Sequence, residues 1–348
     1  MRILVAGAST EAVCGTRDAA RTLAEPLARA GAEPVTVWWE RRGEPFADWA
    51  ARLAVEAPVA DAVLWHYSPF TYSYRGLPTL VRRTLRALGG RPLVPFFHEL
   101  TVAWGDYGLR GAVWAPTQRA ALVPIVRAAC GCVVTTEERE RWLDSRRWLP
   151  DRPTLFVPVH ANVAEVAAPP RADGPPRVGV FGFRRDTIPP ADVVGCLPGG
   201  ATLVLVGAPG PGSPEADEWR AAAAAAGVPL ELTGVLNPSE LSAALHSLDV
   251  VLVTDPRGPS SRRGTLAAVL AHGRPIVAVN GPETWRALVD EDALVAVPAA
   301  ELGAATAGLV ADEPERAALG RRARAFHDEH LAPDLIARSL VSFVKELL

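Results

Sequence analysis

Residues 256 to 265 combine proline, glycine, serine and arginine in an order that suits the binding of an anion. An apolar run that ends at Asp255 precedes them, and a short Ala- and Leu-rich run that stops at Gly273 follows them. This order predicts a buried strand, a polar loop and a helix whose first turn contains Gly264 and Thr265. Unpaired amides and the helix dipole favour negative charge at a helix start. The residues expected around a phosphate or diphosphate are Ser260, Ser261, Arg262, Arg263, Gly264 and Thr265.

Two adjacent arginines, Arg262 and Arg263, are the strongest feature of this loop. A guanidinium is a planar fork that matches two oxygens of a phosphate. Beside a buried strand, two such groups would repel each other unless an anion compensated them, which favours a functional role. The structural alternative is a capping turn whose arginines face solvent.

A second polar turn begins at Gly182, directly after the apolar run that ends at Phe181. Gly182 would let the backbone approach a phosphate closely, and Arg184 or Arg185 would neutralise charge on a leaving group. Ligands of open α/β sheets bind outside the carboxyl ends of the strands, so both loops are expected at one edge of one sheet. A plain turn is the alternative interpretation.

The first half of the chain offers other candidates at predicted strand ends. His98 and Glu99 follow the apolar run 93 to 97. His98 could hydrogen-bond a hydroxyl or share a proton while Glu99 orients it, although a structural hydrogen bond is equally compatible. Aromatic side chains with polar tips suit a sugar or another amphipathic ligand, and those expected in a loop are better candidates than Trp65 or Phe70, which we expect in the core. The loop candidates are Tyr72, Tyr74 and Arg75.

Other familiar motifs do not match. Residues 207 to 213 lack the Lys-Ser/Thr ending of a phosphate-binding P-loop, and their prolines remove amide donors. Residues 6 to 10 are not a Gly-x-Gly-x-x-Gly turn, so a dinucleotide cofactor is not indicated. No His-x-x-x-His pair or carboxylate cluster indicates a catalytic metal. We therefore expect neither a metal nor a cofactor.

Composition limits the class of protein. The chain has 348 residues, 49% hydrophobic and 22% charged, with a net charge of −3 and four cysteines. Such a balance argues against a nucleic-acid partner and against disorder. The arginine clusters at 82 to 86 and 139 to 147 are interpreted as solvated helix faces, with contact to an anionic membrane surface as the alternative. The cysteines form no disulfide framework and no apolar run spans a bilayer, so we expect a cytoplasmic protein that is at most peripheral to a membrane.

Short apolar runs alternate with amphipathic segments along the chain, which is typical of parallel strands joined by helices. A proline-rich stretch, 163 to 176, divides the alternation and reads as a linker. The expected domains are 1–162 and 177–332, and 333–348 is expected to be a closing helix that packs on a neighbour. The predicted strands are 3–6, 34–38, 62–66, 93–97, 132–135, 154–157, 177–181, 202–206, 231–233, 249–253, 275–279 and 293–297. Predicted helices between the strands of the first half are 18–30, 46–54, 77–88, 118–129 and 137–143.

Taken together, the motifs resemble the GT-B-fold glycosyltransferases grouped as glycosyltransferase family 4. The resemblance extends over essentially the whole chain and lies in the order and spacing of short motifs rather than in any one of them. They are residues 13–31, Phe97-His98-Glu99, 157–162, 178–182, 203–207, 233–236 and 271–277.

The resemblance implies an α/β protein of the GT-B class, with two Rossmann-like domains, each a doubly wound parallel sheet, facing each other across a cleft. It implies a retaining, metal-independent glycosyltransferase that moves a sugar from a nucleoside-diphosphate sugar, UDP- or GDP-linked, to a hydroxyl acceptor. The acceptor would be a small molecule, a lipid-linked sugar or a saccharide.

By position, the resemblance also implies a role for individual residues. The catalytic group would comprise His98, Glu99 and Arg184, and Gly182 would join residues 260 to 265 around the donor phosphates. The nucleotide base would lie near Thr233, Gly234, Val235 and Leu236, and the acceptor near Gly15, Thr16, Tyr72, Tyr74 and Arg75.

In one respect the chain departs from the family. The two glutamates that family members carry eight positions apart align here with Ser260 and Ala268. The ribose and donor-sugar contacts therefore stay unassigned. Two alternatives remain open: a nucleotide-sugar-binding protein without transfer activity, and a GT-B-like epimerase acting on the nucleotide sugar itself.

Overall fold

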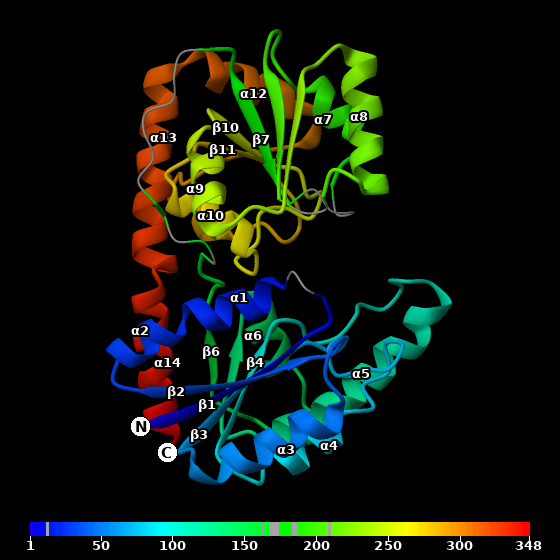
Figure 1. The fold of residues 1–348 in the computed structure, drawn as a ribbon, viewed down its shortest axis with the longest axis vertical. Coiled ribbons are helices and arrows are strands. Elements are labelled where there is room, and N and C mark those ends of the chain that lie inside the picture. Colours follow the sequence, from blue (N-terminus) through cyan, green and yellow to red (C-terminus); the bar gives the residue numbers. More distant parts are fainter. Residues whose placement is uncertain (12–13, 162, 164, 167–173, 183–186, 208–209) are drawn as a thin grey trace. The chain divides into compact units, whose positions relative to one another are not determined.

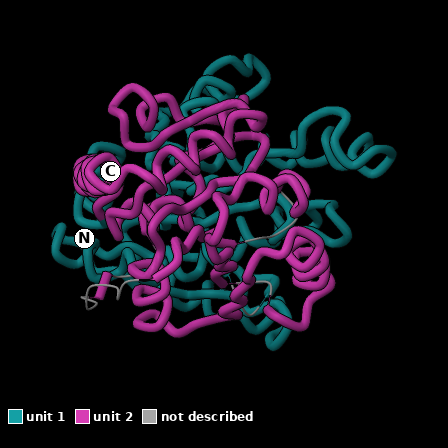
Figure 2. Tube along the Cα trace, turned by 90° about the horizontal axis from the view of Figure 1, so that it is seen from above, with its two compact units in different colours: residues 1–159, 333–348 teal, residues 160–332 magenta. Residues whose placement is uncertain are grey.

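The computed structural model describes the chain except for residues 12–13, 162, 164, 167–173, 183–186 and 208–209 (Figure 1). It divides into two compact units, which Figure 2 distinguishes by colour. Unit 1 contains Met1–Val159 and Pro333–Leu348, and unit 2 contains His160–Ala332. Within the described residues each unit is built around one six-stranded sheet in which all neighbouring strands pair in parallel.

In unit 1 the strand order is β2-β1-β3-β4-β5-β6. The strands are β1 (Arg2–Ser9), β2 (Glu33–Glu40), β3 (Ala62–Tyr67), β4 (Leu93–Phe97), β5 (Cys132–Val134) and β6 (Thr154–Phe156). The helices are α1 (Gly15–Thr22), α2 (Ala24–Arg29), α3 (Phe46–Glu56), α4 (Val81–Ala87), α5 (Leu109–Ala128), α6 (Glu137–Asp144) and α14 (Pro333–Leu347).

Both faces of this sheet are buried, because successive side chains of a strand point to opposite faces. Along β1, Leu4 packs into a core formed with α3 and α5, whereas Ile3 and Val5 pack into the core on the other face. Helix α14 closes that second core with Ile336, Leu340, Val344 and their neighbours (Figure 1). The final helix therefore belongs to the first sheet, although the 173 residues of unit 2 separate it from the rest of unit 1 in sequence.

In unit 2 the strand order is β12-β11-β10-β7-β8-β9. The strands are β7 (Arg177–Phe181), β8 (Thr202–Val206), β9 (Leu230–Gly234), β10 (Val250–Val253), β11 (Ile276–Val279) and β12 (Val295–Val297). The helices are α7 (Pro190–Gly195), α8 (Pro214–Ala226), α9 (Pro238–His246), α10 (Gly264–Ala271), α11 (Arg286–Asp290), α12 (Leu302–Ala311) and α13 (Glu313–Phe326). Its core combines Val178, Leu203, Val250 and Val277 with residues of α7, α8, α12 and α13.

The predicted alternation is confirmed, since each of the twelve predicted strands is present to within a few residues. Two helix predictions are wrong in extent. The segment 18–30 forms two helices with Leu23 between them, and α5 begins at Leu109 rather than at Gln118. Pro116 and Pro124 lie inside α5, so proline did not mark a boundary here as the sequence rule assumes.

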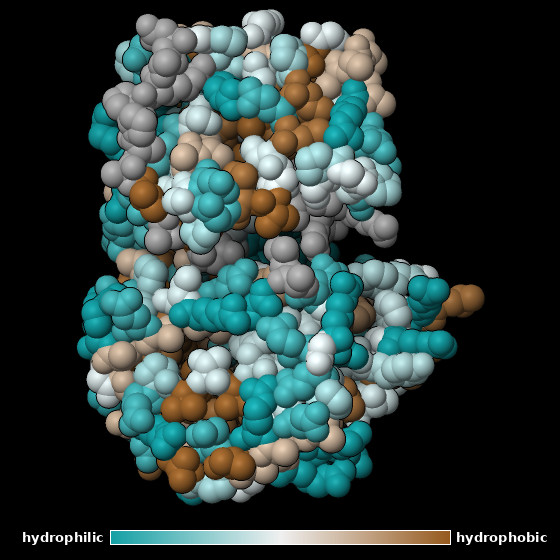
Figure 3. Space-filling model, viewed as in Figure 1, coloured by the Kyte–Doolittle hydropathy of each residue, from teal (hydrophilic) through white to brown (hydrophobic). Residues whose placement is uncertain are grey.

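The face of the molecule drawn in Figure 3 is mainly hydrophilic. On the face in Figure 3, small brown patches lie among teal residues, which is ordinary for a folded chain whose long apolar runs are buried. Among the helices that the structure describes, none combines the length and apolar character needed to span a bilayer.

The first strand extends beyond the predicted residues 3–6 and includes Gly7. The ladder between β1 and β2 continues to Ser9, and Gly7 lies opposite Trp38 within it. A Cβ on Gly7 would lie 2.1 Å from Cζ3 of the Trp38 ring, whose Nε1 donates a hydrogen bond to Ser9 Oγ at 2.7 Å. Gly7 therefore provides room for an indole.

Replacing Gly7 by alanine should destabilise the protein by about 1–3 kcal/mol, because the added methyl group overpacks a rigid ring. Urea unfolding followed by circular dichroism measures the change. Gly43→Ala is the matched control, since a Cβ there meets no atom within 4 Å and its cost should stay within about 0.5 kcal/mol. Equal midpoints for the two variants would contradict this account of Gly7.

Candidate functional site

Gly182, the described residue of the first predicted anion-binding loop, lies beside the start of α10 in unit 2. Strands β7 and β10 pair in parallel with Val180 opposite Leu252, so their carboxyl ends reach the same edge of the sheet. Gly182 has a φ of +76°, and a Cβ on it would lie 3.5 Å from Cγ2 of Thr265. A small pocket of about 30 Å³ lies between Gly182 and the start of α10, and its polar lining includes Thr187, Asp255, Arg263 and Thr265.

Helix α10 begins at this edge without a side-chain cap. Arg263 occupies the capping position with extended backbone, and its side chain makes no capping hydrogen bond. Ser260 and Ser261, in the turn before it, are buried. Amides in the first turn of an uncapped helix carry partial positive charge and attract an anion. Gly264 and Thr265 therefore lie where the sequence predicts an anion-binding helix start.

Carboxylates compensate both arginines of this loop. Arg263 forms an ion pair with Asp255, which is 3% exposed. Arg262 Nη2 donates to Glu283 Oε2 at 2.8 Å, and Arg257 also pairs with Glu283. The inference that these arginines would repel each other unless an anion compensated them is therefore wrong, because the protein itself supplies counter-charges.

Sequence reasoning missed both carboxylates, for different reasons. Asp255 lies two residues beyond the end of β10, and an acid near a strand end could have been recognised from the sequence. Glu283 lies after the next strand, β11, and only the fold brings it to Arg262. Arg257, Arg262 and Arg263 lie close to these two acids at the edge of the sheet. Their guanidinium groups have the geometry that matches phosphate oxygens.

The residues expected near a nucleotide base are at the same edge, two strands from β7. Thr233 ends β9 with Gly234, and its hydroxyl accepts a hydrogen bond from the Gly207 amide at 3.1 Å. Gly234 has a φ of +68°, and Val235 is 63% exposed. Leu236 is partly buried just before α9. The turn thus presents an exposed apolar side chain on a fixed backbone. Arg184 and Arg185 lie outside the described residues.

In unit 1, His98 forms a pair with a histidine that sequence reasoning passed over. His66 Nδ1 and His98 Nε2 are 2.8 Å apart, and the two rings stack with centroids 5.1 Å apart. His66 is 4% exposed at the end of β3, and the His98 amide donates to Tyr67 O at 2.9 Å. One nitrogen of the pair must donate the proton, so the tautomer of each imidazole depends on that of the other, and the contact with His66 orients His98. Glu99 accepts a long hydrogen bond, 3.5 Å, from the Ser68 hydroxyl.

Of the loop residues expected to contact the acceptor, one is buried and two are exposed. Tyr72 is fully buried, and its hydroxyl donates to His66 O at 3.3 Å, so the expectation that it contacts an acceptor is wrong. Burial also raises the pKa of the Tyr72 hydroxyl well above its ordinary value. Tyr74 is 62% exposed, and Arg75, with a φ of +50°, stacks on its ring. These two remain accessible.

Gly15 and Thr16 occupy the first turn of α1. Its capping residue, Cys14, makes no side-chain capping bond, and Gly15 is exposed with no atom within 4 Å of a Cβ placed on it. Arg17, in the next position, donates to Glu40 Oε1 at 2.9 Å. This hydrogen bond raises the pKa of the Arg17 guanidinium, although burial opposes the shift. The start of α1 is therefore open to a ligand, while Arg17 is tied to β2.

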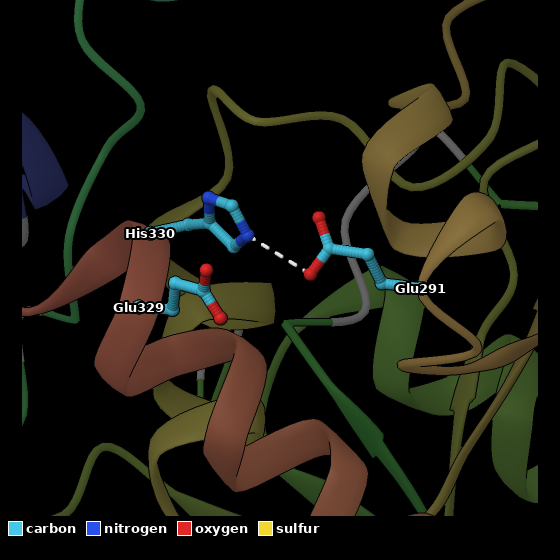
Figure 4. Close-up of side chains that lie close together, drawn as sticks. All are labelled: Glu291, Glu329 and His330. Carbon is cyan, nitrogen blue, oxygen red and sulfur yellow. Dashed lines mark hydrogen bonds and ion pairs between the residues drawn. The ribbon is translucent and has the colours of Figure 1, made fainter.

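One group of described side chains has metal-ligating atoms close together. Glu291, Glu329 and His330 place such atoms within 4.8 Å of one another, as Figure 4 shows. His330 Nε2 and Glu291 Oε2 are 2.9 Å apart, and both glutamates are exposed. A surface hydrogen bond explains this arrangement without an ion.

Replacing Asp255 by asparagine should lower the free energy of unfolding by roughly 3 kcal/mol, because Arg263 loses a buried counter-charge. The double variant Asp255→Asn/Arg263→Gln should recover part of this loss, since it leaves no uncompensated charge. Chemical denaturation of the wild type, both single variants and the double variant gives the four free energies of unfolding of a double-mutant cycle. Strictly additive costs would show that the pair contributes nothing.

Comparison with known proteins supports the architecture. No protein family model and no curated protein sequence matches the chain. Sucrose-phosphate synthase from Thermosynechococcus elongatus superposes with a TM-score of 0.72 at 18% identity, over 99% of this chain and 98% of that one. HepE from Anabaena, solved in complex with UDP-glucose, gives 0.69 at 14%, over 99% and 100%. A Listeria monocytogenes protein assigned as a UDP-N-acetylglucosamine 2-epimerase gives 0.60 at 14%, over 99% and 96%. The chain therefore has the GT-B fold, with two Rossmann-like parallel-sheet units.

Proposed function

We propose that this protein is a glycosyltransferase whose donor is a nucleoside-diphosphate sugar. The observation that carries the proposal is the meeting of Gly182 with the uncapped start of α10 beside Arg262 and Arg263. This edge offers the amides, the hydroxyls and the guanidinium groups that bind a diphosphate. The likeness to a protein solved with UDP-glucose favours the same class of ligand. Because the fold also occurs in a protein assigned as an epimerase, the fold alone does not choose the activity.

The proposed chemistry is mainly electrostatic. As the bond between the anomeric carbon and the β-phosphate oxygen breaks, negative charge grows on the departing diphosphate. Amides at the start of α10 and the guanidinium of Arg262 would stabilise that charge without a metal ion. The acceptor oxygen forms the new bond to the anomeric carbon, and its proton passes to the departing phosphate oxygen. Retention of the anomeric configuration is part of the proposal and rests on the family resemblance.

Unit 1 would contribute the acceptor contacts and His98. The pairing with His66 gives His98 a fixed orientation at the carboxyl end of β4, which suits a histidine that hydrogen-bonds a sugar hydroxyl. His66 acts through His98 and is a positioning residue. We propose Gly15, Thr16, Tyr74 and Arg75 for the acceptor, which would be a small molecule, a lipid-linked sugar or a saccharide.

Arg262→Gln should weaken binding of a nucleoside diphosphate by about tenfold, because a charge-assisted phosphate contact is lost. Arg262 suits this test better than Arg263, whose removal would leave the buried Asp255 unpaired. Calorimetry with UDP, GDP, ADP and TDP, and with the matching nucleosides, measures the effect and selects the base. Arg220→Gln removes an exposed arginine from α8 of the same unit and is the control. Equal weakening of diphosphate and nucleoside binding would contradict the assignment of Arg262 to phosphate.

His98→Asn should lower transfer by roughly a hundredfold while the affinity for the donor stays within twofold, because the histidine acts on the sugar and not on the diphosphate. Turnover is measured with the donor selected above, and the anomeric configuration of the product is read by NMR. His66→Gln should lower turnover less and shift its pH profile. Tight donor binding without transfer or hydrolysis would identify a binding protein, and an altered donor sugar in the absence of acceptor would identify an epimerase.

A further inference from the structure

A second pocket lies in unit 1, on the helical flank of the sheet. Its volume is about 520 Å³, and it is enclosed by the middle of α5, the end of α6 and the turn after α6. These are not the strand ends that carry His98. The pocket falls in the size range of sites that enclose small ligands. Its walls are dominated by Trp104, Trp142, Trp148, Arg119 and Arg146.

Two of the three indoles are exposed, whereas Trp142 is partly buried against the core of unit 1. Trp104 is 62% exposed and Trp148 is 44% exposed, although both are large enough to stabilise the fold if buried. The rings of Trp148 and Trp142 pack edge to face at 86°, with their centroids 6.0 Å apart. This packing restricts the orientation of Trp148 at the pocket. Rigid, exposed aromatic rings around a cavity are typical of surfaces that pack against a ligand.

Each arginine of the pocket is held by an indole. The Cζ atom of Arg119 lies 4.6 Å from the centre of the Trp104 ring, and that of Arg146 lies 4.7 Å from the Trp142 ring. A cation–π contact orients a guanidinium but leaves its charge uncompensated, unlike an ion pair. No acidic residue is among the described residues that line the pocket. The pocket therefore has two oriented positive charges and, among the described residues that line it, no carboxylate.

Arg146 has fewer hydrogen-bond partners than Arg119 in the described part of the chain. Arg119 also donates to the carbonyl oxygens of Val102 and Ala115, at 3.1 and 2.9 Å. In the described part of the chain the Arg146 guanidinium has no hydrogen-bond or ion-pair partner, and its Nε is buried. Burial, with a smaller contribution from the charge of Arg146, lowers the pKa of the Arg119 guanidinium. Both findings indicate that an anion would relieve the local electrostatics.

We propose that this pocket binds an acidic saccharide, with a sugar ring packed against Trp148 and its carboxylate or phosphate held by Arg119 and Arg146. Indole faces match the apolar faces of a sugar ring, and guanidinium forks match the two oxygens of the acid. A hydrocarbon chain would leave both arginines unpaired in an apolar contact, which is unfavourable. The site is separate from the donor site proposed in unit 2 and does not depend on it.

The direct test is binding of acidic and neutral sugars to the full chain. An oligosaccharide of glucuronate should bind at least about tenfold more tightly than the matched glucose oligomer, and glucose 6-phosphate distinguishes phosphate from carboxylate recognition. Arg146→Gln should weaken the acidic ligand about tenfold, and Trp148→Ala should weaken acidic and neutral sugars alike. Arg141→Gln is the matched control, because it removes an exposed charge from α6 that pairs with Glu138 outside the pocket.

Changes in indole NMR signals locate the bound ligand, and thermal unfolding verifies that each variant is folded. Equal affinities for acidic and neutral sugars would overturn the proposal, as would equal losses in Arg146→Gln and Arg141→Gln. Binding to vesicles of anionic phospholipid without binding to any sugar would assign the surface to a membrane and overturn it as well. Affinity for UDP should be the same in all these variants, so failure here and failure of the donor site are distinguishable.

Discussion

The ion pair between Arg263 and the buried Asp255 fixes the part of unit 2 on which the candidate donor site depends. Asp255 also accepts a hydrogen bond from the Arg257 amide, at 2.8 Å, so one carboxylate holds both ends of the loop. The middle of the loop is held from outside, since the Glu283 and Trp285 amides donate to the carbonyls of Arg257 and Pro259. A loop fixed in this way presents its amides in one geometry, and preorganised dipoles stabilise developing charge most effectively.

Unit 1 reaches a comparable rigidity by hydrogen bonding and stacking instead of ion pairing. His66 and His98 lie on neighbouring strands and form a stack with Phe96, whose ring is 4.9 Å from each of theirs. The parallel pairing of β3 with β4 is what brings the two imidazoles together. The two units thus use one topological rule, ligand groups at the carboxyl edge of a parallel sheet, with different chemistry.

Sequence patterns predicted the strands and the meeting of Gly182 with residues 260 to 265, because both follow from apolar runs and from the topology of parallel sheets. They did not predict pairings between distant segments. Glu283 reaches Arg262 only because β11 lies beside β10. Tyr72 shows the opposite failure, since a polar-looking loop folds back and buries its ring against Tyr67 and Trp65. Local patterns of apolar residues predict strands and helices well. Burial of a loop residue, by contrast, is decided by tertiary packing.

The interior of unit 2 bears on the missing pair of glutamates. Ala268, at the position of one of them, is completely buried in α10, and its carbonyl accepts a hydrogen bond from the His272 ring at 2.7 Å. Ser260, at the position of the other, is 2% exposed. Glutamate at either place would have to displace packed neighbours or bury a charge, which is costly without a partner. The nearby carboxylates of this chain, Asp255 and Glu283, are engaged with arginines. If a donor sugar binds here, hydroxyls, amides and guanidiniums must therefore recognise it in place of that carboxylate pair.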